Sequence, residues 1–110
     1  MEITTKDAGE VKVVQFQGHL DSNTSQEAEN YLNELLGQQA NKILVNFEEM
    51  DYISSAGLRI LLSTAKQLKT TDGQLRLCCL NETVQEIFDM SGFSTILQVF
   101  KTETDALGGF

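Results

Sequence analysis

Two adjacent serines, Ser54 and Ser55, precede a segment of helical periodicity and are well placed for chemistry. One face of the predicted helix carries apolar residues at i, i+3, i+4, i+7 and i+10: Leu58, Leu61, Leu62, Ala65 and Leu68. The first amides of a helix lack partners within it, and the positive end of its dipole lies at the same place. A hydroxyl here would tolerate a phosphate, because helix N-termini bind anions. Ser55 could instead serve only as a helix cap, since serine is a favoured N-cap residue.

Two kinds of catalytic site match part of the sequence but lack a required feature, and a third kind has no basis in the sequence. Ser55, His19 and Asp21 have the residue types of a Ser-His-Asp triad, but the serine is not in a Gly-x-Ser-x-Gly loop. Asp51 and Lys101 follow predicted strands as in a two-component receiver domain, but the acidic pair that would hold magnesium is missing. Nucleotide hydrolysis would require a Gly-rich loop with Lys-Ser/Thr, and none is present. We therefore expect no enzymatic activity and no catalytic residue.

The chain has two cysteines, Cys78 and Cys79, and one histidine, His19. Neighbours on a strand point to opposite faces, so we do not expect the two cysteines to share a metal or to form a disulfide with each other. A structural zinc site usually needs four Cys or His ligands. We expect no metal or cofactor, and cysteines that pack as small apolar side chains in a reducing compartment.

Length and charge restrict the class of protein. A chain of 110 residues has room for one domain, residues 1–110. Hydrophobic residues make up 41% of the chain, but no run of them is long enough to cross a membrane. Because the N-terminus does not resemble a signal peptide either, we expect a cytoplasmic protein. A net charge of −8 argues against nucleic acid as a partner and would favour a basic protein surface.

The remaining chain predicts the elements that position the serines. We expect five strands within residues 2–6, 11–17, 43–47, 75–79 and 96–100. Helices are expected after a Thr24–Glu27 capping box with a stop at Gly37, from Leu58, after a cap at Asn81 with a stop at Gly92, and from Thr102. The alternation of strands and helices predicts an α/β fold: a mixed, mostly parallel sheet of about five strands with about four helices, mainly on one side.

Two motifs resemble those of a known family. The segment Tyr52-Ile53-Ser54-Ser55-Ala56-Gly57-Leu58 after a hydrophobic strand resembles the signature loop of the STAS domains, the anti-sigma factor antagonists. The segment Gly18-His19-Leu20-Asp21 matches a second element of that family, and the order of segments fits over nearly the whole chain. In the family, the serine two residues before the glycine is phosphorylated, which corresponds to Ser55, with Ser54 as the second candidate. Many members have aspartate immediately before that serine, whereas this chain has Ser54.

The resemblance implies a binding module that is switched by phosphorylation. It implies binding to an anti-sigma factor serine kinase when unphosphorylated, release on phosphorylation of Ser55, and resetting by a serine phosphatase. Residues expected to face the partner are His19, Asp21, Asn23, Ser54, Ala56, Gly57, Leu58 and Arg59. Asp21 could instead form a local turn, and Gly57 could be needed for packing. The alternative function is a STAS-like scaffold or transporter accessory subunit outside any sigma-factor pathway.

Overall fold

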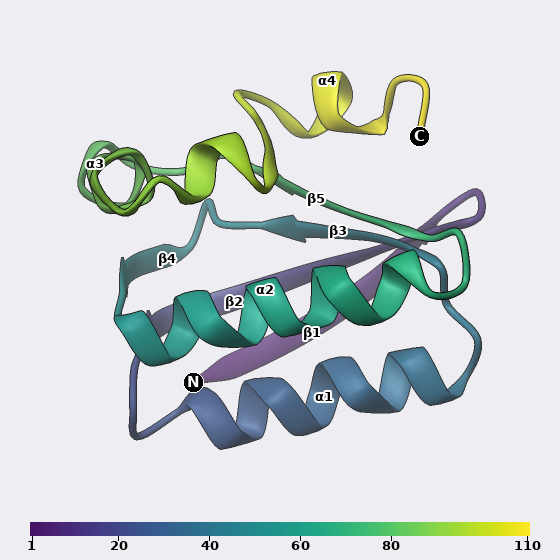
Figure 1. Cartoon of the computed structure of the whole chain (residues 1–110), viewed down its shortest axis with the longest axis horizontal. Coiled ribbons are helices and arrows are strands. Elements are labelled where there is room, and N and C mark those ends of the chain that lie inside the picture. The colour runs from purple at the N-terminus through teal and green to yellow at the C-terminus, as the bar shows by residue number, and fades with distance from the viewer.

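The sequence folds into six strands and four α-helices, and the computed structural model describes residues 1–110 (Figure 1). The strands are β1 (Glu2–Ala8), β2 (Val11–Leu20), β3 (Lys42–Asn46), β4 (Met50–Ile53), β5 (Gln74–Cys78) and β6 (Gln98–Phe100). The helices are α1 (Ser25–Gly37), α2 (Ser55–Lys69), α3 (Glu82–Ser91) and α4 (Glu103–Leu107), with a 3₁₀ helix at Phe93–Thr95. The predicted α/β fold is confirmed.

One mixed sheet, in the order β1-β2-β3-β5-β6, organises the chain. β1 and β2 form an antiparallel hairpin around Gly9, and all other pairs are parallel. The sixth strand, β4, was not predicted. It pairs with the C-terminal end of β2, beyond the part of β2 that pairs with β3. The sequence from β3 through β4 therefore delivers the two serines to the end of β2.

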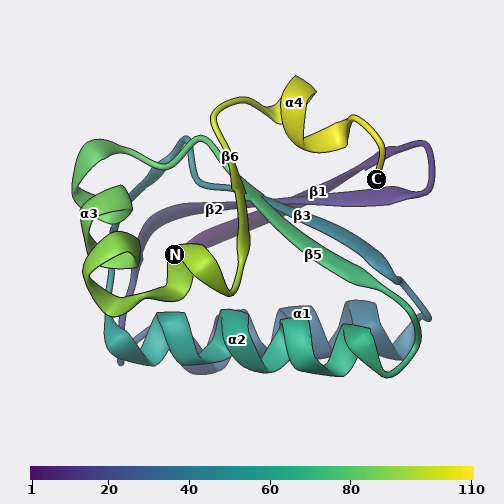
Figure 2. The ribbon, with the colours of Figure 1, turned by 45° about the horizontal axis from the view of Figure 1, so that its top comes forward.

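Helices α1 and α2 lie together on one face of the sheet, and α4 lies on the other (Figure 2). The larger core lies between the sheet and α1, α2 and α3, because the strands alternate apolar residues toward that side. Its fully buried large side chains include Phe16, Phe47, Phe88, Leu20 and Ile53. Phe47 and Phe88 meet edge to face, with ring centroids 6.1 Å apart, which fixes α3 at one end of the sheet.

The second face is sealed by the C-terminal segment, which docks around Arg76 of β5. Nη1 of Arg76 donates to the carbonyl oxygens of Ala106 at 2.9 Å and Gly108 at 2.8 Å. Its guanidinium also lies 4.4 Å from the centroid of the Phe110 ring. Buried charged groups need such partners. Arg76 therefore holds residues 106–110 against the sheet.

The start of α4 is held by a second polar contact. Glu103 accepts hydrogen bonds from Nδ2 of Asn46 at 3.0 Å and from Nζ of Lys6 at 3.1 Å. The hydrogen bond from Asn46 is the main cause that lowers the pKa of Glu103, followed in the same direction by Lys6. These contacts join α4 to β3 and β1.

Several predicted helix ends are confirmed. The Oδ1 atom of Asn81 accepts from the amide of Val84, and Oγ1 of Thr102 accepts from the amide of Asp105. Gly92 ends α3 with a left-handed φ of 78°.

Two predictions about α1 are wrong. Thr24 precedes α1, but its hydroxyl makes no cap hydrogen bond, because it accepts from the amide of Asp21 instead. Gly37 does not stop the helix but is its last residue, and Gln39 supplies the left-handed φ of 66° in the following turn. An intact helical hydrogen-bond pattern thus carries α1 through Gly37.

Candidate functional site

The start of α2 is fixed to the end of β2 by main-chain hydrogen bonds. The amide of Ser54 donates to the carbonyl oxygen of Leu20 at 2.9 Å. The carbonyl oxygen of Ser54 then accepts from the amide of Leu58 at 3.0 Å, which is the first hydrogen bond of the helix. The serine loop is therefore a hydrogen-bonded junction between a strand and a helix.

The two serines differ in exposure. Ser54 is the N-cap, with extended backbone at φ −99° and ψ 175°, but its hydroxyl makes no cap hydrogen bond. That hydroxyl is buried and has no hydrogen-bond partner. Ser55 is the first residue of α2 and is exposed. Only the hydroxyl of Ser55 is thus open to another protein.

The first amides of α2 have no acceptor within the chain. No hydrogen bond from the amides of Ser55, Ala56 or Gly57 is formed, and the first turn contains no acidic residue. Unpaired amides and the helix dipole both favour a negative charge at this position. The surroundings of Ser55 can therefore accommodate an added anion.

Gly57 and Leu58 position the helix through the core. A β-carbon on Gly57 would lie 2.7 Å from Cγ of Leu20 and 2.8 Å from Cγ1 of Ile53. Leu58 is only 5% exposed and belongs to the larger core. Both residues were expected to face a partner, but the structure buries them, and the packing interpretation of Gly57 fits this geometry.

Asp21 and Asn23 lie in the turn that follows β2. Oδ1 of Asp21 accepts from the amide of Asn23 at 2.9 Å, which is a local turn of the kind that aspartate favours. The hydroxyl of Thr24 donates to the carbonyl oxygen of His19 at 2.8 Å. Asp21 thus shapes the turn next to Leu20, to which Ser54 is bonded, and Asn23 is exposed there.

An exposed aromatic pair lies at the same end of the sheet. His19 of β2 pairs in register with Tyr52 of β4, and their rings meet edge to face with centroids 6.4 Å apart. Tyr52 is 44% exposed, and its neighbour Ile53 is buried against the helices. The sequence interpretation missed Tyr52 as a surface residue because it did not predict β4. The segment Met50–Ile53 buries its two ends and exposes Asp51 and Tyr52, so strand alternation would not have identified Tyr52.

Arg59 and Ala56 line a groove between the first halves of α1 and α2. The groove has a volume of about 250 Å³, and its other lining residues are Ser25, Gln26, Glu29, Ile60 and Ser63. Arg59 is exposed and is four residues, about one helical turn, beyond Ser55. A partner that reaches Ser55 across this surface would meet the Arg59 guanidinium.

The groups weighed for catalysis are not assembled. No hydrogen bond joins His19 to Asp21 or to Ser55, because Asp21 is engaged by Asn23 and the His19 ring by Tyr52. Asp51 is exposed on β4. No group of three or more His, Cys, Asp or Glu side chains is arranged to hold a metal ion.

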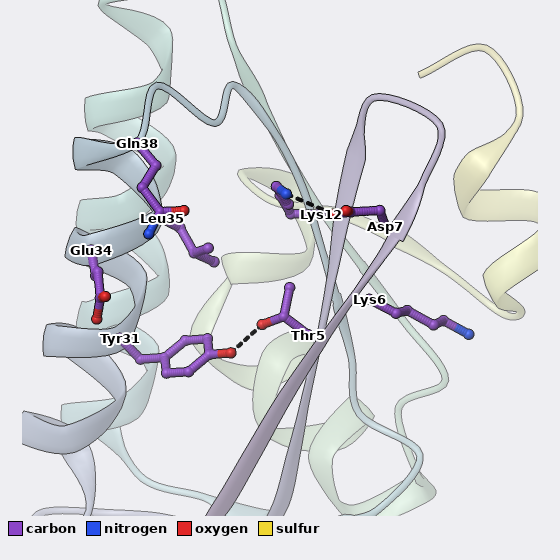
Figure 3. A pocket seen from close by; sticks show the side chains of 8 residues that line it. All are labelled: Thr5, Lys6, Asp7, Lys12, Tyr31, Glu34, Leu35 and Gln38. Carbon is purple, nitrogen blue, oxygen red and sulfur yellow. Dashed lines mark hydrogen bonds and ion pairs between the residues drawn. The ribbon is translucent and has the colours of Figure 1, made fainter.

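A polar hollow of about 400 Å³ lies elsewhere, between β1 and the C-terminal half of α1 (Figure 3). Tyr31 points from α1 to a hydrogen bond with Thr5, and Lys12 pairs with Asp7 at 2.6 Å. Four of its polar side chains are thus engaged with one another in two pairs, and the hollow is at the opposite end of the sheet from Ser55.

The fold and the serine junction can be compared with known proteins. The model of the STAS domain family matches residues 2–106. The chain belongs to the STAS domain family. A Bordetella bronchiseptica protein named as a candidate anti-sigma factor antagonist, BtrV, is 33% identical over 110 residues, which cover 100% of this STAS domain and 95% of that protein.

Solved structures share the fold. A candidate anti-sigma factor antagonist from Thermotoga maritima superposes with a TM-score of 0.91 at 19% identity, covering 96% of this chain and 91% of that chain. The phosphorylated form of the Bacillus cell fate determinant SpoIIAA has a TM-score of 0.73 at 22% identity, covering 96% of each chain. The named relatives support the general role of an anti-sigma factor antagonist for this STAS domain. None of its helices is long and apolar enough to cross a membrane.

Proposed function

We propose that this STAS domain is an anti-sigma factor antagonist switched by phosphorylation of Ser55. The observation that carries the proposal is the contrast between the two serines: the Ser55 hydroxyl is exposed, whereas that of Ser54 is buried. In its unphosphorylated form the domain binds an anti-sigma factor serine kinase, and a serine phosphatase restores that form. The domain does not itself catalyse a reaction.

The physical basis of the switch is a change in the interface and not in the fold. A phosphoserine adds about −1.5 to −2 charges and three acceptor oxygens. The free amides at the start of α2 favour such a charge, so the domain stays folded. A contact built around a small hydroxyl loses shape fit and must desolvate a dianion when the phosphate arrives. A tenfold weaker complex requires only about 1.4 kcal/mol.

The residues around Ser55 divide into supporting and contacting roles. Gly57, Leu58 and Asp21 hold the junction in place. His19, Asn23, Ala56 and Arg59, with Tyr52 added from the structure, form the surface that meets the partner. The net charge of −8 belongs to the domain as a whole and favours its approach to a basic partner.

The test is phosphopeptide mass spectrometry on the protein isolated from growing cells. We expect phosphate on Ser55 and none on Ser54, and we expect S55A to lose the modification while S54A retains it. Phosphate on Ser54, or none on either serine under any growth condition, would overturn the proposal.

A further inference from the structure

Cys78 and Cys79 bring their sulfur atoms together at the end of β5. Cys78 is the last residue of the strand, and Cys79 leaves it with a left-handed φ of 64°. Because of this turn the two Sγ atoms lie 3.5 Å apart, and both cysteines are free thiols. The expectation that the two side chains point to opposite faces is therefore wrong.

We propose that Cys78 and Cys79 are an oxidative modification site, at which a peroxide converts the two thiols into an intramolecular disulfide. The two residues differ in access: Cys79 is partly exposed, and Cys78 is buried beside Val13, Leu44 and Ala106. Burial raises the pKa of the Cys78 thiol, with the neighbouring Cys79 adding to the effect. Cys79 is thus the sulfur that meets the oxidant first.

The reaction is balanced in two steps. The Cys79 thiolate attacks hydrogen peroxide, an S–O bond forms as the O–O bond breaks, and the hydroxide that leaves takes a proton to become water. The Cys78 sulfur then attacks the sulfenic acid, the S–S bond forms as the S–O bond breaks, and the second hydroxide takes the Cys78 proton. In sum, two thiols and one peroxide give one disulfide and two waters.

Chain geometry makes such a disulfide easy to reverse. Adjacent Cα atoms are about 3.8 Å apart across a trans peptide bond. Ordinary disulfides join Cα atoms about 4.4–6.8 Å apart, and deviations from this range store strain and make the bond more reducible. Strained disulfides are the labile ones. The structure thus favours a transient modification.

The peptide bond between the two cysteines also links the end of β5 to β6 and to Phe47, the residue that follows β3. Its carbonyl group, from Cys78, accepts from the amide of Phe47 at 2.9 Å, and its amide, from Cys79, donates to the carbonyl oxygen of Phe100 at 3.3 Å. Closing the disulfide ring must rotate this peptide and weaken one or both bonds. Phe47 begins the turn that leads to β4, so oxidation loosens the chain that precedes the serine junction.

The test treats the reduced wild-type protein with hydrogen peroxide and follows mass and amide hydrogen exchange. We expect the peptide that contains both cysteines to lose two hydrogens, reversal by dithiothreitol, and faster exchange at the amides of Phe47 or Cys79 in the oxidised form. C79S keeps the buried thiol, removes the exposed one, and should show neither change.

Other outcomes decide against the proposal. Oxygen adducts on Cys79 or disulfide-linked dimers as the main product, or no loss of thiols, would overturn the modification site. Unchanged exchange in a protein that has lost two hydrogens would overturn the coupling to Phe47. The same experiment on S55A should give the wild-type result, because the thiol chemistry is independent of Ser55.

Discussion

Gly57 packs directly on Leu20, because a β-carbon at position 57 would lie 2.7 Å from Cγ of Leu20 and 3.0 Å from its carbonyl oxygen. The same carbonyl oxygen accepts the amide of Ser54. Leu20 of β2 thus both packs against Gly57 of α2 and accepts the hydrogen bond from the serine loop. Any atom added at Gly57 must displace backbone as well as side chains.

We predict that Gly57→Ala destabilises the fold by about 1–3 kcal/mol, the usual range for overpacking a core. The control is Gly37→Ala at the end of α1, where a β-carbon meets nothing within 4 Å. That substitution should raise stability by about 0.5–1 kcal/mol, since alanine loses less entropy than glycine in a helix. Urea unfolding of both variants measures the effect, and equal changes would contradict the packing account.

Ser54→Ala should raise the free energy of unfolding by about 1 kcal/mol. The Ser54 hydroxyl is buried without a partner, and an unsatisfied polar group costs about 1–3 kcal/mol. A conventional N-cap serine would give the opposite sign, a loss of about 0.5–2 kcal/mol on replacement by alanine. The sign measured by denaturant unfolding therefore decides whether this hydroxyl caps α2.

Ser55→Asp should separate binding from folding. A carboxylate in the first turn of α2 interacts favourably with the helix dipole by about 0.3–1 kcal/mol, so the thermal melt should not fall. Binding to the anti-sigma factor kinase should weaken at least tenfold, which corresponds to about 1.4 kcal/mol. Ser55→Ala is the control and should bind as the wild type does. Unfolding of S55D, or unchanged binding, would count against the switch.

Acid should weaken the attachment of α4. The pKa of Glu103 is lowered from its ordinary value of 4.5 by the hydrogen bond from Asn46 and by Lys6. Its contribution to stability is therefore fully present above the unfolded pKa and is lost as the pH falls through the folded pKa. The free energy of unfolding should fall less steeply below pH 4.5 in E103Q than in the wild type. Parallel pH profiles would refute this role.

Arg76→Ala should release the C-terminal segment and lower the free energy of unfolding by about 2 kcal/mol, because hydrogen bonds to charged groups contribute about 1.5–3 kcal/mol. The matched control is Arg59→Ala, which removes an exposed guanidinium and should change stability by less than about 0.5 kcal/mol. Hydrogen exchange at residues 106–110 reports the release. Protection there that survives in R76A would show that the aromatic and apolar contacts suffice.

The sequence was most informative where local chemistry and the fold agree. Asn81 and Thr102 cap helices as predicted, because each is followed by a helix whose third amide needs an acceptor. The period of the apolar residues correctly predicted that Leu58, Leu61 and Leu68 are buried in α2, and it placed Ser55 at the start of the helix. Ile60 and Thr64 are also buried but were not predicted, and Leu62 is only partly buried.

Predictions failed where tertiary contacts override a local motif. The Thr24 hydroxyl could have capped α1, but the turn at Asp21 engages it instead. β4 has only four residues and is defined by its partner β2, so its own sequence carries little strand signal. Cys79 has a positive φ although it is not a glycine, so the sequence carried no sign of this turn. The turn changes the direction in which the Cys79 side chain points.

The two edge strands of the sheet, β1 and β6, each have a feature that discourages pairing with a strand of another molecule. β6 is only three residues long, and the seven-residue β1 carries charged Glu2, Lys6 and Asp7 along its length. Short or charged outer strands discourage pairing with strands of other molecules, which is how natural sheets avoid aggregation. These outer strands thereby protect this STAS domain from polymerising through its own backbone.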